Sequence, residues 1–558
     1  MSMLRSAFSF GTHSAVVALV AFAPRVSAQQ IRGDSANHVD SLFANWTGPG
    51  APGCALAVAR GGQTLLTRAY GLANLEYGVP NTPETVFEAG SVSKQFTAAA
   101  VVLLAQQGKL VLDDPVRKYV PEIPDYGAPL TIRQMLNHTS GLRDWGVVVA
   151  AAGWPRGTRV HTQAHVLEVA SRQKSLNYPS GSEYLYSNTN YNLAAIIVER
   201  VSGVSFPEFT RRNLFEPLGM SHTQWRDDYT RTVKGRATAY ARQQDGYHLD
   251  MPFENVFGNG GLLTTVGDLL VWNDNFVTPR VGGRALVDEL QRQGKLTSGR
   301  TIEYAEGLFV TTYRGVPEVS HSGATAGYRA FLARWPRQNL SLALLCNSGG
   351  VNPDDLGHRI AETFLGRDLQ PSAPSTVRSI SLPASELAAR AGRYRNVATN
   401  ELMQVVLQND TLRFVRGGAI VPLSRTEYVS PNGRWHARFD DANGRPARLH
   451  LVAPTGDTLE LVATTEFTPG APQLAEYVGS YRSDEAGSSL SIALDAKGQL
   501  VVRTGVNGTQ PLTPAYPDAF TAPQGIVLFR RDAAGKVNAL SLGLGRVRDL
   551  RFERVGTS

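Results

Sequence analysis

Gly90-Ser91-Val92-Ser93-Lys94 stands directly before an apolar segment, residues 96–104, which predicts a helix over 96–107. Ser91 and Lys94 are three positions apart, so on a helix their side chains face the same side, about one turn apart. A neutral lysine amine at this spacing can accept the proton of a serine nucleophile, and the N–H groups at a helix start can hold an oxyanion. The stretch therefore indicates a serine acyl-transfer site.

The same spacing also arises without any function. Roughly one Ser-x-x-Lys match is expected by chance in a chain with eight lysines, and Ser171-Arg172-Gln173-Lys174 is indeed a second match. That second match ends a predicted helix, with no apolar segment after it, whereas the match at Ser91 opens one. Two further motifs are needed to choose between these interpretations.

The second motif is Tyr186-Ser187-Asn188, which precedes a predicted helix over 191–201. A tyrosine beside the lysine could exchange its proton, as a base or as an acid, if the ammonium charge lowers the pKa of the phenol. Asn188 would point the same way from an extended loop and could hold a substrate amide. The alternative is a tyrosine-rich packing patch.

The third motif is His321-Ser322-Gly323-Ala324, which leads into a predicted strand over 328–335. On an edge strand the Ala324 N–H could be a second oxyanion donor, and Gly323 would let a substrate approach the backbone closely. Taken alone, a histidine in a turn is the usual alternative. The order Ser-x-x-Lys, Tyr-x-Asn, His-x-Gly within one region makes the three motifs together far more specific than any one of them.

Residues 31–367 alternate long helical patterns with short strands. Segments 53–60 and 63–70 predict an antiparallel hairpin, and strands return late, over 328–335 and 340–346. A sheet built from both ends of a region, with helices between, defines an α+β domain.

Residues 40–365 resemble the serine β-lactamase and penicillin-binding-protein superfamily, in the branch of class C β-lactamases, DD-carboxypeptidases and D-aminopeptidases. The resemblance rests on the three motifs and on four surrounding segments, residues 85–97, 108–116, 136–142 and 260–269. It implies a β-lactamase/transpeptidase-like catalytic domain, with an antiparallel sheet flanked by helices and a helical subdomain. It also implies an enzyme of the serine hydrolase type.

By this resemblance Ser91 would be the acylated nucleophile, and Lys94 would be its base partner. Tyr186 would be the acid/base residue, and Asn188 would hold the substrate amide.

The third motif would line the substrate site through His321, Ser322 and Gly323, and the backbone N–H groups of Ser91 and Ala324 would form the oxyanion hole. Class C β-lactamases usually carry Lys-Thr-Gly here, where lysine offers a fixed charge to the substrate carboxylate, whereas histidine is largely uncharged at neutral pH. Carboxypeptidases of this branch typically place hydroxyls on both sides of the glycine, and Ala324 cannot supply the second one. A free carboxylate is therefore held less well, which favours an aminopeptidase- or esterase-like substrate.

A second kind of sequence follows a Pro/Ser-rich linker over 368–384. Leu387-Ala388-Ala389-Arg390-Ala391-Gly392-Arg393-Tyr394-Arg395 is echoed by Leu474-Ala475-Glu476-Tyr477-Val478-Gly479-Ser480-Tyr481-Arg482, which indicates two repeats, over 385–468 and 474–558. Short alternating strands with Gly-rich turns predict two small antiparallel β-barrels. The D-aminopeptidases of the branch resemble this layout, and one of their barrels can lean over the active site. The alternative is that the repeats only stabilise the chain or bind elsewhere.

The N-terminus predicts a secretory signal over 1–28. Arg5 precedes an apolar run over 15–23, and Val26-Ser27-Ala28 places small residues at positions −3 and −1 of a cleavage site. A membrane anchor is the weaker alternative, because the run is too short to span roughly 30 Å of hydrocarbon. We expect an exported protein, periplasmic or extracellular, with no membrane span after cleavage.

The composition argues against several classes of protein. The chain has 558 residues, 42% hydrophobic and 18% charged, which is typical of a globular protein of several domains. The formal net charge of +7 includes no run of five or more basic residues, so it does not indicate a nucleic-acid partner. Two cysteines cannot make a four-ligand zinc site, and His161 and His165 have no evident third ligand. We expect no metal and no cofactor, and a histidine pair that faces solvent from a helix.

The two cysteines lie at opposite ends of the α+β region. Cys54 opens the first predicted strand and Cys346 closes the last one. In the fold that the resemblance implies, these strands are antiparallel neighbours, so the thiols could meet as a disulfide in an export compartment. Two buried free cysteines are the alternative.

These observations predict an exported, cofactor-free serine hydrolase that cleaves amide or ester bonds through an acyl-enzyme at Ser91. Its substrate would be a small molecule or short peptide, with cell-wall fragments among the candidates. The alternatives are a β-lactamase or a D-alanyl-D-alanine carboxypeptidase and, from another class, a catalytically silent protein that binds wall fragments or β-lactams. The acyl and leaving groups, the stereochemistry and the oligomeric state stay open.

Overall fold

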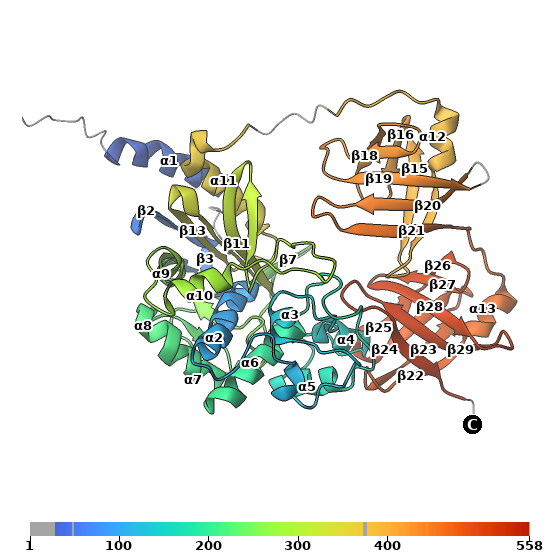
Figure 1. Cartoon of the computed structure of the whole chain (residues 1–558), viewed down its shortest axis with the longest axis horizontal. Helices are drawn as coiled ribbons and strands as arrows, with labels where there is room; N and C mark the ends of the chain where they lie inside the picture. Colours follow the sequence, from blue (N-terminus) through green and yellow to red (C-terminus); the bar gives the residue numbers. More distant parts are fainter. Residues whose placement is uncertain (1–27, 47–49, 372–376, 443–444, 557–558) are drawn as a thin grey trace, which may run out of the picture.

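A six-stranded antiparallel sheet, with the strand order β10-β11-β12-β13-β1-β2, organises the first part of the chain (Figure 1). The expected hairpin forms from β1 (Cys54–Arg60) and β2 (Gln63–Tyr70). β13 (Leu340–Cys346) pairs with β1 along its whole length, so strands from both ends of this part are neighbours. The α+β prediction is confirmed.

The computed structural model describes residues 28–46, 50–371, 377–442 and 445–556. The expected signal segment lies outside this part of the chain except for its last residue, Ala28. Within the described ranges, none of the helices has both the length and the apolar character that crossing a membrane requires.

Helices cover both faces of the sheet. Alternate residues of β1 point to opposite faces: Ala55 and Ala57 pack in one core with α2, whereas Leu56 and Val58 pack in another with α1 and α11. The helices of this part, called the α+β region below, are α1 (Ala28–Leu42), α2 (Lys94–Gln106), α3 (Ile132–Leu136), α4 (Trp145–Ala151), α5 (Gln163–Ser171), α6 (Asn188–Ser202), α7 (Phe206–Thr210), α8 (Glu216–Leu218), α9 (Val266–Val277), α10 (Gly283–Leu290) and α11 (Pro353–Leu365). Its other strands are β3 (Leu72–Asn74), β4 (Val79–Pro80), β5 (Phe87–Glu88), β6 (Gln224–Trp225), β7 (Tyr240–Gln243), β8 (Gly246–Leu249), β9 (Leu262–Thr264), β10 (Phe309–Tyr313), β11 (Val316–Thr325) and β12 (Tyr328–Trp335).

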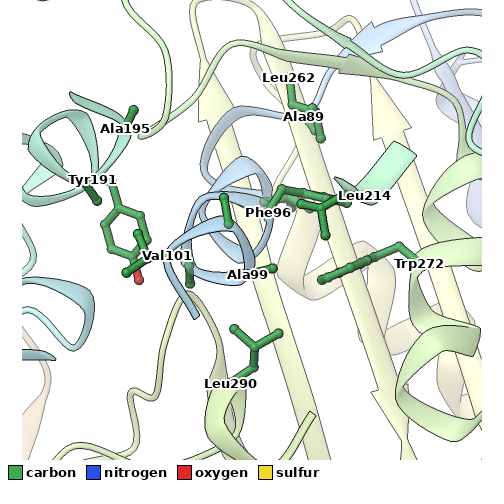
Figure 2. Close-up of a cluster of buried hydrophobic side chains, with 14 of the residues drawn as sticks. Ala89, Phe96, Ala99, Val101, Tyr191, Ala195, Leu214, Leu262, Trp272 and Leu290 are labelled. Atoms are coloured by element: carbon green, nitrogen blue, oxygen red, sulfur yellow. The ribbon is translucent and has the colours of Figure 1, made fainter. Parts of the chain in front are cut away.

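The helix α2 runs through the larger of these cores. Every residue from 94 to 104 is buried. Figure 2 shows Phe96, Ala99 and Val101 among side chains of the neighbouring helices, with Tyr191 of α6 on one side and Trp272 of α9 on the other. The expected helix therefore exists, although it begins two residues earlier than predicted, at Lys94. Because it is packed on all sides, it holds the preceding Ser91 segment in a fixed place.

A disulfide joins the two ends of the α+β region. Cys54 and Cys346 are directly opposite one another in the β1–β13 ladder, both are fully buried, and their sulfurs are bonded. The bond closes a loop with a sequence separation of 292 residues. In the chain-entropy account, a loop of this size strongly restricts the unfolded chain.

Replacing both cysteines by alanine is therefore expected to lower the melting temperature of the full chain, by roughly 5–10 °C, because the unfolded chain regains the entropy of that loop. Calorimetry of the wild type and of the Cys54→Ala/Cys346→Ala variant would measure this. Equal melting temperatures under non-reducing conditions would contradict the expectation.

Two β modules follow the α+β region (Figure 1). In the first β module, a closed barrel of eight strands follows the helix α12 (Ala384–Arg390): β14 (Gly392–Asn396), β15 (Leu402–Gln408), β16 (Thr411–Phe414), β17 (Ala419–Pro422), β18 (Glu427–Val429), β19 (His436–Ala442), β20 (Arg445–Val452) and β21 (Thr458–Thr464). In the second β module, a sheet of nine strands follows α13 (Ala471–Tyr477): β22 (Gly479–Ser483), β23 (Ser488–Leu494), β24 (Leu500–Thr504), β25 (Gly508–Pro511), β26 (Thr513–Tyr516), β27 (Ala519–Ala522), β28 (Gly525–Arg531), β29 (Val537–Gly543) and β30 (Leu550–Arg554).

The expected barrel-like repeats are thus present, but the second barrel does not close. Its two edge strands, β25 and β26, follow each other in the chain and do not pair. Each contains a proline, Pro511 or Pro514, which has no N–H to donate to a neighbouring strand. Proline is therefore tolerated at this open seam.

The echoed sequence corresponds to a helix followed by the first strand of each module. Tyr394 and Tyr481 occupy equivalent positions, and both are buried. The Tyr394 hydroxyl donates to the backbone oxygen of Arg390 at 2.9 Å, and the Tyr481 hydroxyl donates to that of Tyr477 at 2.8 Å. In both modules the repeated tyrosine therefore links the first strand to the preceding short helix by the same kind of hydrogen bond.

The second β module packs directly against the α+β region. Trp145 and Val149 of α4 share one core with Phe520, Leu540 and other residues of the module. A buried ion pair joins Arg143 to Glu485, with 2.8 Å between Nη1 and Oε1. This interface places the loop between β29 and β30 beside the centre described next.

Candidate active site

Ser91 and Lys94 lie where the sequence predicts, at the start of α2. Ser91 is in the short 3-10 turn Gly90–Ser93, and Lys94 is the first residue of the helix. Lys94 Nζ lies 3.1 Å from Ser91 Oγ, 2.9 Å from Asn188 Oδ1 and 2.6 Å from the backbone oxygen of Asn259. Burial, followed by the positive charge of Arg546, lowers the pKa of Lys94 well below its ordinary value.

Tyr186 is brought to the same place from a separate segment. Lys94 Nζ is 4.8 Å from the centre of the Tyr186 ring. Burial raises the pKa of Tyr186, and the nearby Ser91 hydroxyl only partly opposes this. The condition stated for a tyrosine base, a phenol pKa lowered by an ammonium charge, is therefore not met; burial favours the protonated phenol and the neutral amine.

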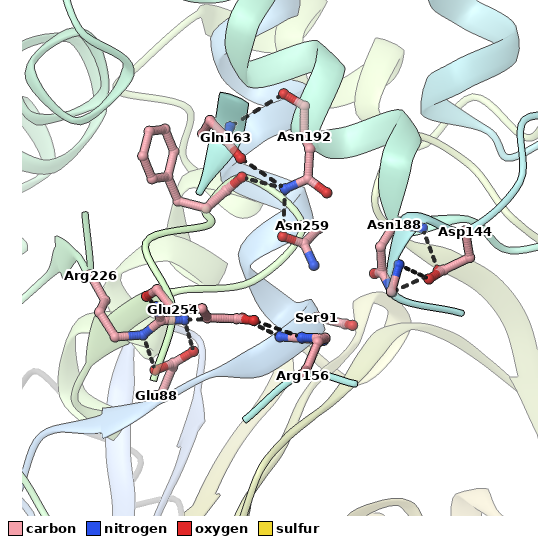
Figure 3. Close-up of polar contacts among 12 residues, drawn as sticks. Glu88, Ser91, Asp144, Arg156, Gln163, Asn188, Asn192, Arg226, Glu254 and Asn259 are labelled. Atoms are coloured by element: carbon pink, nitrogen blue, oxygen red, sulfur yellow. Dashed lines mark hydrogen bonds and ion pairs between the residues drawn. The ribbon is translucent and has the colours of Figure 1, made fainter. Parts of the chain in front are cut away.

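Asn188 differs from its expected setting, because it is the first residue of α6 and not part of an extended loop. Its Oδ1 accepts from Lys94, and its Nδ2 donates to Asp144 Oδ2 at 2.9 Å (Figure 3). Asp144 also accepts the Asn188 backbone N–H and caps the start of α4. The helix start orients the amide, since a first-turn N–H can be satisfied by a neighbouring carboxylate.

The third motif lies on β11, at the free edge next to Ser91. β10 pairs with β11 only as far as Ser320, so within the residues that the structure describes β11 has no strand partner beyond Ser320 on this side. A Cβ on Gly323 would lie 2.1 Å from the backbone oxygen of Ala89, and a Cβ on Gly90 would lie 2.7 Å from the backbone nitrogen of Ala324. Only glycine fits at these two positions, and their contact brings the Ser91 and Ala324 backbones side by side in the pocket wall.

His321 is a neutral, oriented side chain. Burial and the nearby Lys94 lower its pKa to about 3. Its Nδ1 is 2.6 Å from the backbone oxygen of Ser322, which can only accept, so Nδ1 carries the proton. Its Nε2 then accepts from the Tyr304 hydroxyl at 3.0 Å. His321 therefore offers no positive charge to a substrate carboxylate at neutral pH.

These groups surround a pocket of about 570 Å³. Its wall includes Ser91, Tyr186 and Asn188 together with the third motif from His321 to Ala324. All the side chains predicted from the three motifs are brought together here, except that Lys94 lies fully buried behind Ser91.

The second match, at Ser171 and Lys174, lies elsewhere. Ser171 ends α5 and donates to the backbone oxygen of Glu168, and the Lys174 side chain is 70% exposed. The spacing there is a chance match.

Sequence reasoning missed four charged residues in the pocket wall: Arg156, Arg329, Asp354 and Arg546. Arg156 is fastened to Glu254, with Nε 2.8 Å from Oε2, and the ion pairs continue through Arg226 (Figure 3). No local motif marks these residues, and the ion-pair partners of Arg156 and Arg546, which are Glu254 and Asp144, are far away in the chain.

Arg546 is the least expected of the four, since it comes from the second β module. Its guanidinium lies 4.7 Å from the centre of the Tyr186 ring and 3.6 Å from Asp144. Its loop is held at Arg546 itself and two residues further on: Asn177 donates to the Arg546 backbone oxygen at 3.0 Å, and Arg548 pairs with Glu183 at 2.9 Å. The second β module thus contributes a cation to the pocket.

His138 holds the Tyr186 segment in place through a ring contact and two hydrogen bonds. It lies in one of the four segments on which the family resemblance rests. The His138 and Tyr186 ring centres are 4.2 Å apart, and the Ser187 N–H donates to His138 Nδ1 at 3.2 Å. Its backbone oxygen accepts from the Leu185 N–H at 3.0 Å.

The prediction that His161 and His165 form a solvent-facing pair on one helix is wrong. His161 precedes α5 and is fully buried beside Trp145, so the two residues neither share a helix nor face solvent together. Within the described ranges, no group of three or more His, Cys, Asp or Glu side chains is placed to hold a metal ion.

A serine in the pocket wall with a buried lysine behind it, at the start of a core helix and beside an antiparallel sheet covered by helices, is the arrangement of a serine hydrolase of the β-lactamase/transpeptidase fold. The family model described as Beta-lactamase matches residues 39–366, and the chain belongs to this family. The resemblance on which the sequence interpretation rests is therefore confirmed.

Similar proteins extend the comparison beyond this region. A protein from Brucella ovis named D-aminopeptidase is 26% identical over 538 residues, covering 93% of this chain and 98% of that protein. The octameric penicillin-binding protein homologue from Pyrococcus abyssi superposes with a TM-score of 0.55 at 24% identity, covering 77% of this chain and 99% of that chain. A D-amino acid amidase from Ochrobactrum anthropi SV3 superposes with a TM-score of 0.50 at 22% identity, covering 60% and 99%. At these identities the two superpositions show that this chain has the same fold as those two proteins over the regions covered.

Proposed function

We propose that the chain is an exported serine hydrolase that cleaves amides of D-amino acids, or short peptides with a D-residue at the N-terminus, through an acyl-enzyme at Ser91. The observation that carries this proposal is the buried amine of Lys94, 3.1 Å from Ser91 Oγ, with its two other contacts made to oxygen acceptors.

Acylation would begin at Lys94. A neutral amine has two N–H groups and one lone pair; Asn188 Oδ1 and the Asn259 backbone oxygen accept the N–H groups, which leaves the lone pair for the Ser91 proton. As that proton moves to Nζ, Oγ would attack the substrate carbonyl carbon. The N–H groups of Ser91 and Ala324 would then hold the oxyanion.

Tyr186 would protonate the leaving amine. Because its raised pKa keeps the phenol protonated, it would donate as the C–N bond breaks and recover a proton from the Lys94 ammonium. In deacylation, water would give a proton to Lys94 Nζ and attack the acyl carbon, and Ser91 Oγ would take that proton back as it leaves. Every group then returns to its starting state.

The substrate class is supported by a whole-length relative and by the third motif. The relative named D-aminopeptidase spans both β modules as well as the α+β region. His321 is uncharged at neutral pH, and the Asp354 carboxyl shares its wall of the pocket. The motif offers a free substrate carboxylate no fixed cation and one hydroxyl, that of Ser322, which supports an aminopeptidase-like substrate over a carboxypeptidase-like one; the cation in this wall, Arg329, lies opposite Ala324 on the neighbouring strand.

Export is supported by the signal-like N-terminus and by the buried disulfide, since disulfides persist mainly in oxidising compartments. N-terminal sequencing of the protein recovered from the export compartment should begin at Gln29.

A panel of substrates tests the proposed specificity. We expect D-phenylalanine amide to be hydrolysed at least about tenfold faster, in kcat/KM, than L-phenylalanine amide, N-acyl-D-Ala-D-Ala or a chromogenic cephalosporin, a difference of about 1.4 kcal/mol in transition-state binding. Faster hydrolysis of the acyl-D-Ala-D-Ala peptide would identify a carboxypeptidase, and faster hydrolysis of the cephalosporin would identify a β-lactamase.

The Arg546→Ala variant tests the part played by the second β module. Since the charge of Arg546 lowers the pKa of Lys94, its removal should raise that pKa and move the acid limb of kcat/KM to higher pH. The lost contact with the Tyr186 ring should also lower kcat/KM by roughly tenfold at neutral pH. Arg551→Ala is the matched control, because Arg551 lies in the same module and pairs with Glu553, outside the Ser91 pocket. An unmoved acid limb in Arg546→Ala would contradict this role.

A further inference from the structure

The barrel of the first β module is covered at one end and open at the other. Its eight strands close on themselves. The helix α12 covers one end: Leu387 is buried in the barrel core, and Arg390 pairs with Asp441 on the rim of that end. Eight strands enclose a space that side chains can fill or that can hold one small ligand.

The barrel interior is filled only in part. Next to α12 and in the middle, Tyr394, Val405, Phe439 and Leu449 are each at most 2% exposed. At the opposite end a cavity of about 740 Å³ opens between the strand ends. Its inner wall is apolar, formed by Met403, Phe414, Ile420, Ala437, Leu451 and Leu459. This volume lies in the range of small-molecule sites.

The rim of the cavity carries an aromatic side chain and two cations. Trp435 lines it with 42% of its surface exposed, on a loop held closed by hydrogen bonds between Ser430 and the Trp435 backbone. Arg413 and Arg416 also line the cavity. In the part of the chain that the structure describes, neither arginine forms an ion pair or a side-chain hydrogen bond, and no Asp or Glu lines the cavity.

We propose that this cavity binds one amphipathic carboxylate, of the fatty-acid class, with its chain inside the barrel and its head group against Arg413 and Arg416. The apolar wall suits the chain, and the two unpaired guanidinium groups suit an anion. The site is separate from the Ser91 pocket and does not depend on the proposed hydrolase activity.

The open end of the barrel faces the α+β region. Arg300 of that region donates to the Thr455 backbone oxygen at 2.8 Å and pairs with Asp457, both in the loop between β20 and β21. A second hollow of about 500 Å³ lies between Glu303 and Trp435 and continues from the cavity mouth. A ligand can therefore reach the cavity through this hollow without displacing the closed end.

Titration of the full chain with 11-(dansylamino)undecanoic acid tests the proposal. We expect saturable binding of one probe per chain, with brighter, blue-shifted emission from the apolar cavity. Dodecanoate should displace the probe, and dodecanol should do so much less well because it lacks the anion. Absence of saturable binding by the wild type would overturn the proposal.

Variants locate the site. Arg413→Glu/Arg416→Glu should weaken probe binding by about tenfold or more, and Trp435→Ala should weaken it several-fold. The matched controls are Arg425→Glu, a 78% exposed arginine at the closed end of the same barrel, and Trp154→Ala, a 39% exposed tryptophan of the α+β region. Both controls should bind like the wild type. All five side chains are exposed at least in part, so circular dichroism should show an unchanged fold; equal probe binding by test and control variants would overturn the assignment.

Discussion

Ser91→Ala is expected to abolish turnover while leaving the fold unchanged. The substitution removes only one oxygen from a short turn, and the Lys94 contacts with Asn188 and Asn259 stay in place. Without the hydroxyl there is no nucleophile, so kcat should fall by a factor on the order of 10³–10⁶. Initial rates on a D-amino acid amide, with calorimetry of both proteins, would measure the effect.

Ser171→Ala is the matched control, because it makes the same change in the other Ser-x-x-Lys match. It should keep wild-type rates. Assignment of Ser91 as the nucleophile requires a loss far larger than tenfold. If Ser91→Ala keeps more than about a tenth of the wild-type kcat, the assignment is wrong.

Lys94→Arg is expected to be nearly as damaging, although it keeps a basic residue. Only an unprotonated amine can take the Ser91 proton, and a guanidinium stays protonated in proteins. Loss of a general base should lower kcat/KM by roughly 10²–10⁴. Lys94→Met, which keeps the length without the amine, should show a loss of the same size.

The pH profile follows from the same residue. Activity needs neutral Lys94, so kcat/KM should rise with pH as the amine loses its proton and should fall as pH drops through its pKa. Burial lowers that pKa well below its ordinary value, so the wild type should stay active at neutral pH, where an ordinary lysine is protonated. Lys174→Met, at an exposed lysine, should leave both rate and profile unchanged. A Lys94→Arg enzyme with wild-type rates would refute the role of Lys94.

The functional residues that could be predicted from the sequence are those that belong to a motif of a few neighbouring residues. Ser91 and Lys94 are marked by their helix spacing, and Gly323 by its place in the His-x-Gly motif; the structure adds the reason for the glycine, the close approach of the Ala89 backbone. The helix that carries the first pair was visible because its apolar residues are continuous, as expected for a segment buried on every side.

The residues that the sequence could not locate act through distant partners. Arg546 reaches the pocket because Asn177 and Glu183 hold its loop, more than 360 positions away in the chain. Neither the repeat nor the composition of the second β module indicates which of its loops touches the α+β region. His161 illustrates the same limit, because it precedes α5 and lies against the Trp145 side chain of α4.

Protonation states were also outside the reach of sequence. A lysine next to a tyrosine allows either residue to be the base. The structure distinguishes them, because burial acts in opposite directions on the two groups: it favours a neutral amine and a neutral phenol. This supports the proposal that the amine is the proton acceptor.

Mapping the covalent adduct formed with a fluorophosphonate tests the central claim most directly. Ser91 Oγ would attack phosphorus and release fluoride, leaving one phosphonyl group per chain on the peptide that contains residue 91. The account predicts this single adduct in the wild type, none in Ser91→Ala and slow formation in Lys94→Met. An adduct on another serine, or equal labelling of wild type and Ser91→Ala, would contradict it.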